Sequence, residues 1–226
     1  NMERELARNA ERYRFMKWAS SSLRGVRVHP PGTGIMHTIN LERLSSVIAQ
    51  EKRDDAMSAF PDTLLGTDSH TPMVNGIGVL AWGVGGLEAE SVLFGMPAML
   101  RIPDVVGVKL TGALRDGVLA TDLALTVTEA LRQRELAGSF VEFFGSGVAN
   151  LSAGERAVVA NMAPEYGAST GYFPIDEQTL RYLRDTGRAE AQVQLVADYA
   201  KRQSLWFDGQ ATPRYSDIVE LDLGTV

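Results

Sequence analysis

The stretch VVGVKLTGALRDGVLATDLALTVTEALRQRELAGSFVEFFG, residues 105–145, joins two apolar runs through a segment with helical periodicity. The runs VVGVKLTG and FVEFFG are rich in β-branched and aromatic residues, which favours two short buried strands. Between them, Thr121 is placed to cap a helix whose apolar residues Leu123, Val127 and Leu131 recur at i, i+4 and i+8. Alternation of strand, helix and strand predicts α/β layering.

The sequence downstream of this stretch keeps the same alternation. Ser152 and Glu155 form a capping-box pattern for a helix that should stop before Pro164. The runs DEQTLRYLRDTG and EAQVQLVADYAKRQSL predict two more helices, and VELDL predicts a closing strand. A change of pattern near residues 103–107 predicts a domain boundary there.

The sequence upstream of that boundary is less regular. We expect one helix over residues 3–20 and a short helix from Asn40 through about Ala49. KRDDAMSA has the composition of a solvated loop, and DTLLGTD that of a short buried strand. GGLEAESVLFG predicts a short helix with two early glutamates near its positive end.

Composition limits the classes of function that the chain can have. The net charge is −6 and no dense Lys/Arg block occurs, which disfavours nucleic acid as a partner. The chain contains no cysteine, so it can form neither disulfides nor Cys-ligated metal sites. No apolar run approaches a bilayer span, and the N-terminal residues are too charged for a signal peptide. We therefore expect a soluble, cytoplasmic protein.

The segment GTDSHTPMVNGIGVLAWGVGG, residues 66–86, places Asp68, Ser69 and His70 side by side. Neighbours on an extended chain point to opposite faces, so we expect that these three cannot form a hydrolase relay among themselves. No G-x-S-x-G elbow surrounds Ser69, and the glycines match neither of the common nucleotide-binding loops. Two interpretations remain: a polar turn that ends a strand, or a site where Asp68 and His70 each pair with a distant partner.

The other chemically able residues are also open to two interpretations. His37 lies among apolar neighbours and fits a satisfied core histidine as well as an acid–base group. Asn161 and Glu165 are four residues apart in NMAPE, either as an orienting pair or as a helix end with a surface carboxylate.

Several blocks, in order along the chain, resemble the aconitase family in its bacterial and cytosolic branch. They are PPGTGIMHTINLE, LLGTDSHTPMVNGIGVLAWGVGGLEAE, KLTG, LATDLALTVTEALR, FVEFFGSGV, ANMAPEYGASTGYFPID and VELDL. The resemblance implies three-layer α/β/α domains with mixed sheets. Residues 1–104 would be the latter part of the first domain and residues 105–226 the second domain. It also implies conversion of citrate to isocitrate through cis-aconitate.

The resemblance implies a role for each matching site residue. His37 and His70 match two active-site histidines, and Asp68 matches the carboxylate partner of His37. Ser69 matches a residue that binds a substrate carboxylate. Asn161 and Glu165 match a substrate-site pair, in which the glutamate partners His70. The implied pairings are therefore Asp68 with His37 and Glu165 with His70.

The chain departs from the family in the residues that hold iron. Family members bind a 4Fe-4S cluster through cysteines in segments that follow the block VELDL, whereas this chain has no cysteine and supplies no metal ligand. The family's remaining catalytic base and arginine clamps have no counterpart here either. The resemblance thus implies an interior segment that is inactive alone and exposes an apolar face to the remaining domains, with which it would bind a tricarboxylate.

Three alternatives remain open at the level of sequence. The segment could belong to a 2-methylisocitrate dehydratase or a related hydro-lyase, because the discriminating arginines lie outside the chain. It could belong to an RNA-binding regulatory relative of aconitase, or to a degenerate protein with a purely structural role.

Overall fold

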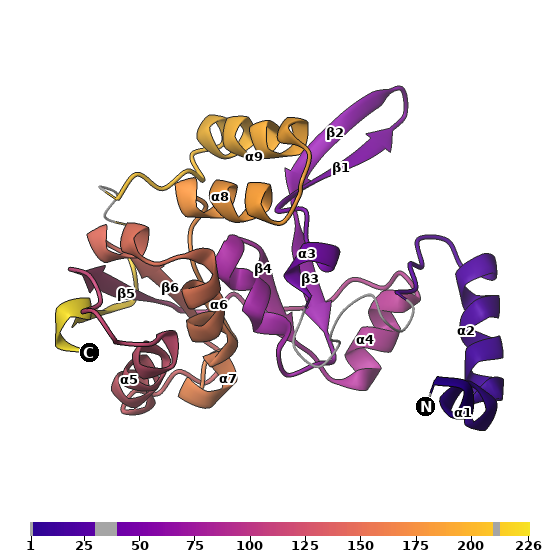
Figure 1. Cartoon of the computed structure of the whole chain (residues 1–226), viewed down its shortest axis with the longest axis horizontal. Helices are drawn as coiled ribbons and strands as arrows, with labels where there is room; N and C mark the ends of the chain where they lie inside the picture. Colours follow the sequence, from indigo (N-terminus) through magenta and orange to yellow (C-terminus); the bar gives the residue numbers. More distant parts are fainter. Residues whose placement is uncertain (1, 30–39, 210–212) are drawn as a thin grey trace. The chain divides into compact units, whose positions relative to one another are not determined.

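The computed structural model describes residues 2–29, 40–209 and 213–226, which form two compact units (Figure 1). The first unit, residues 1–36, contains helices α1 (Met2–Arg8) and α2 (Ala10–Ser22). The single helix predicted over residues 3–20 is wrong in this respect, because the chain leaves helical geometry at Asn9. Neither helix buries a residue, so the first unit has no core of its own among the described residues.

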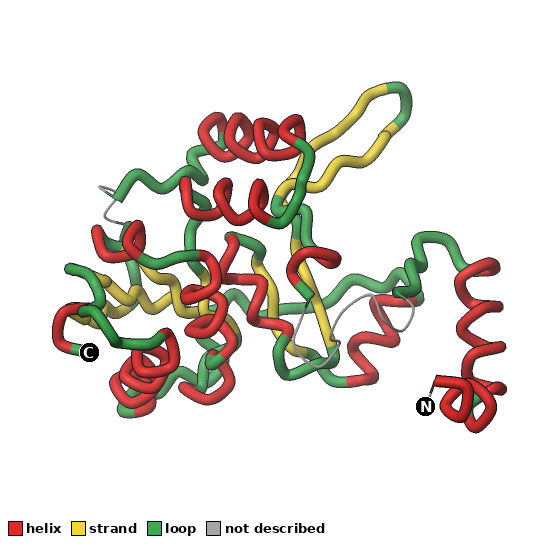
Figure 2. Tube along the Cα trace, in the orientation of Figure 1, coloured by secondary structure: helices red, strands yellow, loops and turns green. Residues whose placement is uncertain are grey.

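The second unit, residues 37–226, is built on a four-stranded sheet with the order β7-β6-β5-β8. Its strands are β5 (Val105–Thr111), β6 (Phe140–Phe144), β7 (Thr170–Tyr172) and β8 (Asp217–Asp222), and every pair is parallel. Parallel pairing requires crossover connections between the strands, which are usually helical. The predicted α/β class is confirmed (Figure 2).

Helix α5 (Ala120–Arg132) connects β5 to β6 and buries the face that its periodicity predicts. Leu123, Val127 and Leu131 are buried in one core cluster with the apolar residues of β5 and β6. The cap differs from the prediction: the helix begins after Leu119, whose backbone N–H donates to Asp122 Oδ2 at 2.8 Å. The side chain that caps the start of the helix is therefore Asp122 and not Thr121.

Helix α6 (Ala153–Asn161) connects β6 to β7 through the short helix α7 (Ala163–Tyr166). The predicted capping box is confirmed, because Ser152 N donates to Glu155 Oε2 at 2.7 Å and Glu155 N donates to Ser152 Oγ at 3.3 Å. The helix ends before Pro164, as predicted.

A second core lies between α8 (Glu177–Asp185), α9 (Glu190–Arg202) and the segment 41–83. That segment contains α3 (Leu41–Leu44), the 3₁₀ helix η1 (Thr71–Ile77) and the parallel strands β3 (Thr63–Gly66) and β4 (Leu80–Gly83). Helix α4 (Gly86–Leu93) follows β4. Two short 3₁₀ helices, η2 (Ser146–Asn150) and η3 (Leu223–Thr225), follow β6 and β8.

The segment 48–61 forms an antiparallel hairpin of β1 (Ile48–Arg53) and β2 (Ala56–Pro61). Two predictions are wrong here: the helix from Asn40 ends at Leu44 and does not reach Ala49, and KRDDAMSA is not a simple loop. The turn between the strands is Asp54-Asp55, and Asp54 takes a positive φ of 54°. Aspartate tolerates this left-handed region better than most residues, so the charged dipeptide closes a hairpin.

One buried ion pair joins the two cores. Arg156 of α6 is fully buried and makes a bidentate contact to Asp176, with Nη1–Oδ1 at 2.9 Å and Nη2–Oδ2 at 2.6 Å. Its remaining donors reach the carbonyl oxygens of Leu151 and Val148. Asp176 Oδ1 also accepts from the backbone N–H of Gln178, which caps α8. Every part of the guanidinium therefore has a polar partner.

Replacing Arg156 by Met should lower the free energy of unfolding of the chain by about 3–5 kcal/mol, because the Asp176 carboxylate stays buried without its counter-charge. Urea unfolding followed by tryptophan fluorescence measures this loss. The matched control is Arg184→Met on α8, where the arginine pairs with Glu177 and Glu190 at the surface and should matter little. Equal losses in the two variants would contradict the role given to Arg156.

Candidate functional site

The candidate site begins where β3 and β4 end. The two strands run parallel, with Gly66 opposite Gly83, so their carboxyl ends lie at one edge of the pair. Residues 67–70 turn away at that edge, and Val84 N donates to Gly66 O at 2.8 Å just beyond it. The carboxyl edge of parallel strands is where α/β folds commonly place ligands.

Asp68 and Ser69 both contact the same imidazole nitrogen of His70. His70 Nδ1 lies 2.9 Å from Asp68 Oδ1 and 3.3 Å from Ser69 Oγ, and the backbone N–H of His70 donates to Asp68 Oδ1 at 2.7 Å. The side chain of His70 is 21% exposed and that of Asp68 36% exposed. The carboxylate thus fixes the orientation of the ring while leaving the pair within reach of a ligand.

Ser69 does not point away from Asp68 and His70, as an extended chain would require, so that prediction is wrong. The chain turns at Asp68, whose carbonyl oxygen accepts from Thr71 N at 3.1 Å, and the turn brings the side chains together. A hydrolase relay still does not follow, because it needs the serine and the acid on opposite ring nitrogens. Here both contact Nδ1.

Two buried polar residues that the sequence reasoning missed hold this turn. Thr71 Oγ1 donates to Asp68 O at 2.6 Å, and a Cβ on Gly66 would lie 2.2 Å from that hydroxyl. Asn75, fully buried on η1, donates to the carbonyl oxygens of Pro72 and Ala81 at 2.8 Å each. Its Oδ1 accepts from Ala81 N at 3.1 Å. The sequence signal was an amide inside the apolar run MVNGIGV, where every polar atom needs a partner.

Asn161 and Glu165 lie on either side of the break between α6 and α7. Asn161 is half-buried, and its Oδ1 is a buried atom with no hydrogen-bond partner among the described residues. Glu165 is exposed and borders an open cavity of 490 Å³ together with Arg132 and Arg134. Burial raises the pKa of the adjacent Tyr166 hydroxyl, and the Glu165 carboxylate adds to this rise, so Tyr166 stays neutral.

The pairings of Asp68 with His37 and of Glu165 with His70 stay predictions. His37 lies outside the described residues, and the Asp68 contact that is described is to His70. Among residues 2–29, 40–209 and 213–226, no cluster of three histidine or acidic side chains is arranged to hold a metal ion. Within the same ranges, no helix has both the length and the apolar character to cross a membrane.

Comparison with known proteins gives a consistent result over the whole chain. Residues 1–226 match the model of the aconitase family, described as aconitate hydratase. Aconitate hydratase A is 53% identical in Pseudomonas aeruginosa over 226 residues, 56% in Thermus thermophilus over 228 and 51% in Staphylococcus aureus over 227. Each alignment covers 100% of this chain and 25% of the relative, so the chain spans about a quarter of the length of these proteins.

The carboxylate of Asp68 should select the tautomer of His70. In the neutral imidazole, a proton on Nδ1 donates to Asp68 Oδ1, so ¹⁵N spectra of the ring should report the Nδ1–H form. Asp68→Ala should move His70 toward the Nε2–H form, whereas Ser69→Ala should leave it unchanged. With three histidines in the chain, a His70→Gln sample assigns the signals. An identical tautomer in wild type and Asp68→Ala would show that the contact does not orient the ring.

Gly66→Ala should lower the free energy of unfolding by about 1–3 kcal/mol, because the new methyl group overlaps the buried Thr71 hydroxyl. Gly86→Ala is the matched control, since a Cβ there meets nothing within 4 Å at the start of α4. Denaturant unfolding of both variants makes the comparison. If the two glycines tolerate alanine equally, then close packing under the turn is not what requires Gly66.

Proposed function

The chain belongs to the aconitase family, and we propose that it is a segment of an aconitate hydratase. This hydro-lyase interconverts citrate and isocitrate through cis-aconitate in the tricarboxylic acid cycle. The observation that carries the proposal is the match of the whole chain, at 51–56% identity, to aconitate hydratase A of three bacteria. Because the chain spans about a quarter of those proteins, the reaction belongs to a larger polypeptide of which this chain is one part.

In this proposal His70 is the proton-transferring residue of the segment. A dehydration needs an acid that delivers a proton to the departing hydroxyl group and takes it back on rehydration. Asp68 holds the ring of His70 through Nδ1. In the proposal, Nε2 is the atom that exchanges the proton. Ser69 is exposed beside the pair, and its hydroxyl would donate a hydrogen bond to a substrate carboxylate.

The remaining site residues complete the substrate pocket in the proposal. Asn161 would use its amide to bind substrate. Glu165 would act with His70, and His37 would be a second imidazole at the same pocket. Residues 1–104 would belong to one domain of the whole protein and residues 105–226 to the next.

The 4Fe-4S cluster of the family does not fit the residues of this chain. Cluster iron is held by thiolates, and the chain has no cysteine. The described residues also offer no histidine or carboxylate cluster in place of thiolates. In the proposal the cluster is therefore held by the rest of the polypeptide, which would also bind the tricarboxylate substrate.

In the proposal this protein is cytoplasmic.

Exchanging the matched quarter of the Thermus thermophilus relative for this chain tests the proposal. The chimera should dehydrate citrate and isocitrate, whereas the 226-residue chain alone should show no turnover. In the chimera, His70→Ala should lower kcat by roughly 10²–10⁴-fold, because a general acid–base group is lost. Ser69→Ala should act mainly on KM.

His29→Ala is the control in the chimera, because it removes a histidine that has no assigned role. Turnover by the chain alone, or full activity of the His70→Ala chimera, would contradict the proposal. Preference for 2-methylisocitrate would assign the segment to the related dehydratase. Binding of stem-loop RNA by the chain alone, with a steep dependence on salt, would favour the regulatory alternative.

A further inference from the structure

Exposed apolar side chains are concentrated between residues 87 and 102 of the second unit. Met99 and Ile102 are each 91% exposed and Leu87 is 81% exposed, which is unusual for such residues in a folded chain. We refer to these residues as the 87–102 surface. Its members are Leu87, Leu93, Phe94, Met96, Met99, Leu100 and Ile102.

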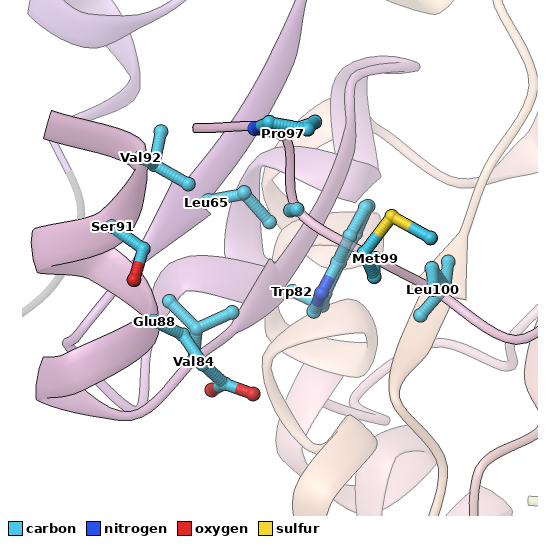
Figure 3. Close-up of a pocket in the computed structure, with 10 residues that line it drawn as sticks. Leu65, Trp82, Val84, Glu88, Ser91, Val92, Pro97, Met99 and Leu100 are labelled. Carbon is cyan, nitrogen blue, oxygen red and sulfur yellow. The ribbon is translucent and has the colours of Figure 1, made fainter. Parts of the chain in front are cut away.

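An apolar groove of 290 Å³ adjoins this surface (Figure 3). Leu65 and Trp82, opposite each other on β3 and β4, contribute to its lining together with residues of α4 and of the segment 97–100. Its polar side chains already have local partners: Glu88 Oε2 accepts from Gly85 N at 2.8 Å, and Ser91 Oγ donates to Leu87 O at 2.9 Å. The groove therefore suits an apolar side chain and not a polar small molecule.

The strands beneath the groove form an incomplete sheet. Among the described residues, β3 and β4 pair with each other alone, as a two-stranded parallel sheet. Parallel sheets occur almost always with more strands and with both faces covered, because their edges and faces need partners. A surface with exposed apolar groups, a groove and an unextended sheet in one place has the properties of an interface.

We propose that the 87–102 surface is the docking site for another region of the same aconitase-family polypeptide, outside the quarter that this chain represents. This inference rests on the proposed function. The relatives are about four times as long as this chain, since the chain covers 25% of each, so they contain ample additional polypeptide. The docked region inserts an apolar side chain into the groove and covers Leu93, Phe94 and Met99.

Protease protection in the full-length chimera tests this surface directly. Chymotrypsin cuts beside exposed aromatic residues, so the chain alone should be cut at Phe94, which is 75% exposed, and resist at the buried Phe143. In the chimera, cleavage at Phe94 should slow by roughly tenfold or more, because docking covers the site. Cleavage at Phe143 in each sample shows whether the fold is intact.

Substitution gives a second measurement. Leu93→Glu should leave the Tm of the chain alone unchanged, because the side chain is 80% exposed there, and should lower the Tm of the chimera. Leu125→Glu on α5, where the leucine is 62% exposed, is the matched control and should have the same small effect in both proteins.

Equal cleavage at Phe94 in chain and chimera, or equal effects of Leu93→Glu in the two proteins, would overturn the docking proposal. Protection in the chain alone that rises with its concentration would assign the surface to a second copy and also overturn it. The citrate assay of the same chimera separates the two proposals. A chimera that is protected at Phe94 but inactive would contradict the proposed function alone. An active chimera that is cut freely at Phe94 would contradict the docking proposal alone.

Discussion

The bidentate ion pair between Arg156 and Asp176 is the contact on which the second unit depends. Both side chains are buried, so their charges are stabilised by each other, by the carbonyl and amide groups around them and by the Phe173 ring next to Arg156. Arg156 belongs to the helix behind the main sheet, whereas Asp176 starts the helical pair of the second core. The directional bonds of this ion pair orient α6 relative to the start of α8, where the two cores meet.

The same helix transmits this constraint to the candidate site. The backbone of η1 rests directly on α6, and a Cβ on Gly76 would lie 2.5 Å from Ala157 N. Asn75 joins η1 to β4 through two hydrogen bonds to Ala81, and its carbonyl oxygen accepts from Phe173 N next to β7. The turn that carries Asp68 and His70 is thus attached to a rigid support. Proton transfer depends on this kind of support, because a small displacement of the acid removes most of its effect.

Local patterns in the sequence predicted the longer helices and three of the four strands after residue 105, because their signals are strong and agree with the tertiary structure. The three-residue strand β7 was not predicted, because it is too short to show a pattern. The Ser152–Glu155 capping box and the apolar face of α5 are examples. The hairpin at 48–61 was missed because its turn is two charged residues, one in a left-handed conformation that composition does not reveal. The partners of Arg156 and Asn75 come from distant or buried groups, which no local pattern specifies. The direct contact of Asp68 and Ser69 with His70 depends on a turn, which the extended-chain assumption did not include.

The chemistry proposed for the segment also gives a reason for its exposed apolar surface. An imidazole held by a carboxylate can deliver and accept protons, but expulsion of an unactivated hydroxyl group requires in addition a Lewis acid at that oxygen. In our proposal that second component comes from other polypeptide, since this chain has no cysteine and its described residues offer no acidic or histidine cluster. A protein that divides one reaction between regions needs an interface that holds the regions in register. In our proposal the exposed residues of the 87–102 surface supply that interface. The buried residues beneath the turn hold His70 in place within the segment, and the exposed residues hold the segment against the rest of the polypeptide.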